Sequence, residues 1–189
     1  ALATRGETQW VPAPSVAGEE VLFNEQTSTS GVRWETVRSN HAFGQFLHPS
    51  TFIFSARPGS SDEWQITRVE YFAAKTAWFS GGDYQLDLDK ASDDGLPTKE
   101  SLYNVTLNPN SVAWSGSWES LSMDGLPWLD ATQGVTVRFT YESGSSRLML
   151  PVAEAPSFNG FLGTDESSSD WLRPAANQSL LFKVYGRIR

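Results

Sequence analysis

The chain has 189 residues, of which 39% are hydrophobic and 19% are charged, and these values are typical of a globular domain rather than a disordered segment. Its formal net charge is -8, from 14 basic and 22 acidic residues, which argues against binding to nucleic acids or to anionic membrane surfaces. Cysteine is absent, so disulfides, thiolate metal sites and a cysteine nucleophile are excluded, and no apolar run is long enough to predict a transmembrane helix.

The first 31 residues are polar and contain prolines, and we predict an irregular N-terminal arm over residues 1–31 in which only residues 21–23 form a short strand. This arm is either a mobile chain end or a segment that packs on its own domain or on a neighbouring chain. From residue 32 onward, apolar and polar residues alternate in short runs, which is typical of strands with one buried and one solvated face. The predicted strands cover residues 32–38, 43–47, 51–55, 64–72, 84–88, 103–107, 112–123, 135–141, 147–152 and 180–185.

Turn residues separate these runs, most clearly at residues 89–100, where Asp, Gly and Pro cluster. Strands at a spacing of roughly ten residues predict an all-β domain, an antiparallel two-sheet sandwich that is jelly-roll-like, over residues 32–189. In the predicted strand over residues 64–72, strict alternation places Ile66 on one face of the sheet and Val69 and Tyr71 on the other.

Residues that support catalysis are scarce. The chain has two histidines, His41 and His48, and lacks the motifs of serine hydrolases, zinc peptidases and nucleotide-binding loops. Because a predicted bend separates the two histidines, we expect each of them in a loop or at the surface. We therefore predict that the protein is not an enzyme, with polysaccharide hydrolysis as the catalytic alternative. The strand-borne acids available to that alternative are Glu35, Glu70, Glu119 and Glu142.

Four aspartates gather around one predicted turn, at Asp87, Asp89, Asp93 and Asp94. Calcium prefers about six to eight oxygen ligands, and such a turn supplies several of them. The order departs from that of an EF-hand, because Ala91 takes a ligand position and no glutamate closes the loop. The alternative is an Asp-rich turn whose side chains bond their own backbone. Calcium is thus the one cofactor that the sequence suggests.

Aromatic side chains are frequent, with 8 tryptophans, and exposed rings bind sugars by stacking on their C–H faces. Trp114 and Trp118 fall on one face of a predicted strand, about 13 Å apart. We expect Trp118 in the core, whereas Trp114 is compatible with either the core or the surface. The remaining candidates lie in predicted polar loops. The predicted carbohydrate-binding residues are Trp114, Trp171, Trp78 and Phe79.

The order of these strands and turns resembles a known family. The segments YQLDLDKASDDGLPTKE and SLLFKVYG, with the hairpin VAWSGSWESLSMDGLPWLDATQGVTVRFTY between them, are similar to the jelly-roll modules of exported bacterial proteins known as choice-of-anchor domains. The resemblance covers residues 52–186 and leaves the N-terminal segment outside it. It implies a β-sandwich similar to carbohydrate-binding modules, and it identifies no catalytic residues.

Two functions are compatible with these features. The first is a non-catalytic extracellular β-sandwich that binds polysaccharide or a surface glycan. The second is a structural subunit of a virion or of an extracellular surface assembly, such as a decoration, tail-associated or fibre protein. In that case residues 1–31 contact a neighbour, either another copy in a homo-oligomer or a different subunit of the assembly. Either function predicts a location outside the cell, at a cell surface or at a virion surface. Neither a nucleic-acid partner nor membrane insertion is predicted.

Overall fold

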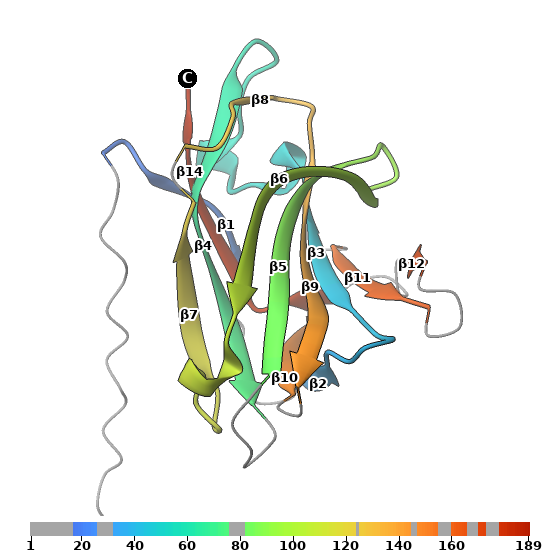
Figure 1. Ribbon diagram of the computed structural model, residues 1–189. Coiled ribbons are helices and arrows are strands. Elements are labelled where there is room, and N and C mark those ends of the chain that lie inside the picture. The colour runs from blue at the N-terminus through green and yellow to red at the C-terminus, as the bar shows by residue number, and fades with distance from the viewer. Residues whose placement is uncertain are drawn as a thin grey trace, which may run out of the picture.

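A computed structural model describes residues 17–25, 32–75, 82–123, 125–144, 147–154, 160–165, 170–172 and 178–189. Its strands form two antiparallel sheets that face each other, as Figure 1 shows. Within the described ranges, no helix has the length and apolar character that crossing a membrane requires. The prediction of an all-β, antiparallel two-sheet sandwich is confirmed.

The first sheet has eight strands, with the order β1-β14-β4-β10-β13 along its main path. Strand β2 pairs with β10, and β7 and β8 pair with β4. The strands of this sheet are β1 (Glu20–Glu25), β2 (Arg33–Thr36), β4 (Glu63–Lys75), β7 (Ser117–Ser122), β8 (Leu129–Asp130), β10 (Leu148–Glu154), β13 (Gln178–Leu180) and β14 (Phe182–Ile188).

The second sheet has six strands in the order β12-β11-β3-β9-β5-β6. Its strands are β3 (Phe43–Leu47), β5 (Gly82–Ala91), β6 (Pro97–Leu107), β9 (Val135–Gly144), β11 (Phe161–Thr164) and β12 (Trp171–Leu172). Three short 3-10 helices complete the described elements: η1 (Pro49–Thr51), η2 (Phe54–Ala56) and η3 (Pro109–Ser111). The chain crosses repeatedly between the two sheets.

The core lies between the sheets and follows the alternation of the sequence. On β9, Val135, Val137 and Phe139 are fully buried, and they point toward the eight-stranded sheet. The Phe139 ring meets the Tyr71 ring of β4 edge to face, with centroids 4.9 Å apart. The buried side chains of the two sheets thus form one continuous hydrophobic core.

Strand β4 contains a β-bulge that strict alternation did not predict. Ile66, Val69 and Tyr71 are all buried in the core, so the prediction that Ile66 faces away from the other two is wrong. The register with β14 shifts at this point, because Arg68 lies opposite Tyr185 and Ile66 lies opposite Gly186. The extra residue in β4 returns Ile66 to the inner face, as a bulge does.

Several predicted boundaries change. Strand β1 pairs with β14, so residues 20–25 belong to the sandwich and the predicted boundary at residue 32 is wrong. Residues 51–55 contain parts of two 3-10 helices rather than a strand. The predicted strand over residues 112–123 begins only at β7, because a turn occupies residues 114–115. The rest of the predicted arm, residues 1–16 and 26–31, lies outside the described residues.

Candidate functional site

The two predicted aromatic residues that the structure describes, Trp114 and Trp171, do not form one platform. Trp114 lies in the turn before β7, beside the eight-stranded sheet, whereas Trp171 lies in β12 at an edge of the six-stranded sheet. The structure corrects the prediction that Trp171 lies in a loop, because β12 pairs with β11. Trp78 and Phe79 fall outside the described residues. The two described candidates therefore belong to separate faces of the protein.

Trp114 is 47% exposed, and the ammonium of Lys75 lies 5.7 Å from its ring centroid. The predicted strip of Trp114 and Trp118 is wrong, because Gly116 between them has a φ of +87, a left-handed conformation that interrupts the strand. The expectation of a core position for Trp118 is also wrong. Its ring is half-buried on the outer face of β7, where it packs edge-on against Phe72 at 5.7 Å.

Trp171 packs over the outer face of the six-stranded sheet. Its ring lies over Gly44 of β3, where a Cβ atom would stand 3.5 Å from the ring carbon Cζ3. Any larger residue at position 44 would also collide with the carbonyl oxygen of Val137, at 2.6 Å. The guanidinium carbon of Arg138 on β9 lies 5.9 Å from the ring centroid of Trp171. A half-buried indole is thus held against the strands beside a cation.

Arg138 joins Trp171 to two of the predicted calcium ligands. Its Nε donates to Asp89 Oδ2 at 2.5 Å, and its terminal nitrogen lies 3.6 Å from Asp87 Oδ2. Asn104 on β6 donates from its side-chain amide to Asp87 Oδ1. The guanidinium therefore supplies the positive charge that a cation would otherwise bring to these carboxylates.

The four predicted calcium ligands are not gathered around one point. Asp93 and Asp94 are exposed in the turn between β5 and β6, whereas Asp87 and Asp89 are buried on β5 beside Arg138. Among the residues that the structure describes, no group of three or more His, Cys, Asp or Glu side chains is placed to hold a metal ion. The calcium prediction thus receives no support from this arrangement.

Two adjoining cavities open beside Trp171. The smaller has a volume of about 180 Å³ and reaches from Trp171 and Thr140 to the turn between β2 and β3. The larger, of about 430 Å³, continues from that turn toward Tyr141 and Arg147. Four residues line both cavities: Arg38, Ser39, Asn40 and Tyr141. The outer face around Trp171 therefore extends into a continuous hollow.

The turn that lines this hollow is a tight backbone hairpin. The N–H of Arg38 donates to the carbonyl of His41 at 2.9 Å, and the N–H of His41 donates back at 3.1 Å. Ser39 and Asn40 occupy the tip, where such residues favour a two-residue turn. The ring of His41 packs on Phe43 with centroids 4.3 Å apart, whereas His48 Nδ1 accepts from the N–H of Ser50 and caps η1. Each histidine therefore has a local structural role.

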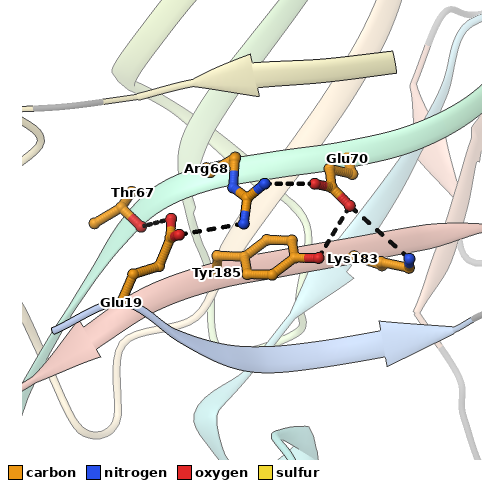
Figure 2. A network of polar contacts seen from close by, with 6 residues as sticks. All are labelled: Glu19, Thr67, Arg68, Glu70, Lys183 and Tyr185. Carbon is orange, nitrogen blue, oxygen red and sulfur yellow. Dashed lines mark hydrogen bonds and ion pairs between the residues drawn. The ribbon is translucent and has the colours of Figure 1, made fainter. Parts of the chain in front are cut away.

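A second polar cluster lies on the outer face of the eight-stranded sheet (Figure 2). Arg68 donates to Glu70 at 2.8 Å and to Glu19 at 3.2 Å, and its guanidinium lies 3.7 Å from the ring centroid of Tyr185. Lys183 contacts the other oxygen of Glu70 at 3.9 Å, and that oxygen also accepts from the Tyr185 hydroxyl at 3.1 Å. The polar network on this face comprises Glu19, Thr67, Arg68, Glu70, Lys183 and Tyr185.

This network is structural in character. Glu70 is fully buried, and burial raises its pKa, although the Tyr185 hydrogen bond and the charges of Arg68 and Lys183 oppose that rise. Burial also lowers the pKa of Lys183. Buried charges of this kind persist only when each has partners. Because Glu19 precedes β1 and bonds to β4, the network ties the start of the described chain to the sheet.

Tyr185 gives the network a measurable pH dependence. Burial, and then the charge of Glu70, raises its pKa to about 12. The folded state keeps the proton of the Tyr185 hydroxyl, whereas the unfolded chain loses it near pH 10. The protonated hydroxyl therefore contributes to the stability of the fold fully below pH about 10, and this contribution is lost as the pH rises to about 12. An NMR titration of the Tyr185 ring should have its midpoint near 12, and Glu70→Gln should lower it. Glu63→Gln, an exposed control, should leave it unchanged, and a wild-type midpoint near 10 would contradict the assignment.

The strand-borne acids are placed apart. Glu70 and Glu119 lie on opposite faces of the eight-stranded sheet, because Glu119 is opposite Tyr71 and Ser120 is opposite Glu70. Glu119 lines a separate cavity of about 160 Å³ at the rim of the core, where it accepts from Ser117 at 2.6 Å. Glu35 pairs with Arg33, and Glu142 is exposed on β9. Glu70 and Glu119 therefore do not form the facing pair that glycoside hydrolysis uses.

No protein-family model matches the chain, and no curated protein matches its sequence. Sequence reasoning missed three arginines that line the cavities or contact Trp171: Arg38, Arg138 and Arg147. Only the alternation of β9, which places Arg138 on the solvated face, gave a local signal for one of them.

Proposed function

We propose that the protein is a non-catalytic carbohydrate-binding β-sandwich that acts outside the cell or at a cell or virion surface. Its binding site is the outer face of the six-stranded sheet around Trp171. The observation that carries this proposal is the half-buried Trp171 ring beside Arg138, with Asp87 and Asn104 next along the face. Carbohydrate sites combine a flat aromatic surface with a few fixed hydrogen-bonding groups.

The polar groups are suited to sugar hydroxyls. A hydroxyl both donates and accepts, so it pairs with a carboxylate, a guanidinium or an amide. Asp87 is held between Arg138 and Asn104, which fixes its orientation before a ligand arrives. Fixed polar groups lower the entropy that binding costs. The similarity of the strand order to choice-of-anchor modules is in keeping with this proposal.

Trp171→Ala should weaken binding to an oligosaccharide by about 2 kcal/mol, which is about thirtyfold in Kd, because truncating a central aromatic anchor has effects of this size. The wild type is first tested against a panel of plant, algal and bacterial polysaccharides, and the best ligand is then measured by isothermal titration calorimetry. Trp114→Ala is the matched control, since it removes an exposed tryptophan beside the other sheet. Normal binding by a folded Trp171→Ala variant would refute this site.

A structural subunit is the second candidate, and the edge position of β1 favours it. Among the described strands, β1 pairs only with β14, and an unpaired edge is a template for a strand from another chain. Light scattering on the whole chain and on a chain without residues 1–16 distinguishes the two candidates. The deletion stops before β1 so that the sheet is preserved. An oligomer that dissociates on deletion would favour assembly, and a monomer in both forms would favour a binding module.

A further inference from the structure

The two cavities beside Trp171 carry a local excess of positive charge. Their described lining residues include Arg38 and Arg147, and no described lining residue is an aspartate or a glutamate. The whole chain has the opposite balance, with 22 acidic and 14 basic residues. In so acidic a protein, a hollow whose described lining holds arginines and no carboxylate is suited to an anion.

We propose that these cavities bind the carboxylate or sulfate group of an acidic sugar, so that the ligand of the Trp171 site is an anionic polysaccharide. This inference rests on the proposed function and names the class of its ligand. A guanidinium pairs with the oxygens of a carboxylate or sulfate through two parallel hydrogen bonds, which neutral hydroxyls do not match.

The ion pairing of its arginine distinguishes this hollow from the neighbouring cluster around Arg138. Arg138 is already paired with Asp87 and Asp89, so its charge is neutralised. Arg38, by contrast, is exposed and forms no ion pair with any carboxylate in the described part of the chain. Its guanidinium is therefore available to an incoming anion.

The polar groups and the size of the cavities also suit a sugar ligand. Ser39 and Asn40 add a hydroxyl and an amide at the tip of the hairpin, and the Tyr141 hydroxyl is fixed by donating to the Gly144 carbonyl at 2.7 Å. Thr140, two residues after Arg138 on β9, lines the smaller cavity with Trp171. The smaller cavity thus adjoins the ring on which we propose that a sugar stacks. The larger volume of about 430 Å³ lies within the range of about 300–1,000 Å³ usual for small-molecule sites.

The test compares three oligosaccharides by calorimetry: a neutral cello-oligosaccharide, an oligogalacturonate that carries carboxylates, and a carrageenan oligosaccharide that carries sulfates. The wild type should bind one of the charged oligosaccharides more tightly than the neutral one, with an affinity that falls as salt is raised. Arg38→Ala and Arg147→Ala should each weaken that binding about tenfold. Arg189→Ala is the control, because it removes the same charge from the eight-stranded sheet, where Arg189 pairs with Glu63.

The outcomes separate this inference from the proposed function. If the neutral oligosaccharide binds as tightly as the charged ones, or if Arg38→Ala behaves like Arg189→Ala, the inference is wrong while the Trp171 site stands. If no oligosaccharide binds, the proposed function fails, and an NMR titration with free galacturonate and with sulfate ion then decides on the hollow. Shifts of the Ser39 and Asn40 amides that vanish in Arg38→Ala would support an anion site, and unshifted amides would overturn it.

Discussion

Arg68→Ala should lower the free energy of unfolding by about 3–5 kcal/mol, because removing one partner of a buried ion pair leaves the other charge uncompensated. The side chain of Arg68 is 6% exposed and lies between the carboxylates of Glu70 and Glu19, which are 0% and 2% exposed. Without the guanidinium, the partners that remain among the described residues are Lys183 and Tyr185 for Glu70 and Thr67 for Glu19. The ring contact between Arg68 and Tyr185 is lost as well.

Urea unfolding followed by tryptophan fluorescence measures this effect. Arg33→Ala is the matched control, because Arg33 pairs with Glu35 at 2.6 Å while its side chain is 52% exposed. Exposed pairs of this kind contribute about 0–1 kcal/mol. If the two alanine variants unfold at the same urea concentration, the network of Figure 2 does not stabilise the sheet.

Trp64→Ala should cost about 3–5 kcal/mol of stability, the range for truncating a buried aromatic residue to alanine. Trp64 is fully buried on β4, and its ring meets Phe52 edge to face with centroids 5.0 Å apart. Its indole N–H donates to the carbonyl of Asp130 at 3.0 Å. The substitution therefore leaves a large cavity where β8 joins β4, and it removes one of the two hydrogen bonds that the Asp130 carbonyl accepts, the other coming from the N–H of Gln133.

Trp114→Ala provides the comparison for this second variant. It deletes the same side chain from an exposed turn, where substitutions usually change stability by less than about 0.5 kcal/mol. Thermal unfolding of both variants, monitored by circular dichroism, measures the difference. A fall in Tm for Trp114→Ala as large as that for Trp64→Ala would show that the turn before β7 is part of the core packing.

The polar network and the proposed binding site lie in separate parts of the sandwich. On the eight-stranded sheet, the charges of Arg68 and Glu70 are buried and paired with one another. In the turn between β2 and β3, the Arg38 side chain is exposed and lines a hollow beside Trp171. Loss of stability in Arg68→Ala and loss of binding in Arg38→Ala should therefore be independent effects, because distant sites act additively.

The sequence by itself determined the fold class of this protein. Alternation along residues 135–141 and residues 84–88 predicted β9 and β5, and turn residues marked their ends, because both signals depend only on neighbouring residues. The same local rule failed at Ile66, because a bulge in the pairing of β4 with β14 places this side chain on the inner face of the sheet. It failed again before β7, where the left-handed conformation of Gly116 ended a run that resembled a strand.

Only the tertiary structure decided which side chains meet. The sequence pattern predicted Asp87 and Asp89 as calcium ligands, but the pairing of β5 with β9 places the guanidinium of Arg138 beside their carboxylates. Trp171 reached the same guanidinium because β11 and β12 extend the sheet beside β3. Arg38 and Arg147 share a cavity although they are far apart in sequence. Periodicity reports the face of one strand, whereas a site on a sheet is built from neighbours across several strands, and strand pairing alone establishes those neighbours.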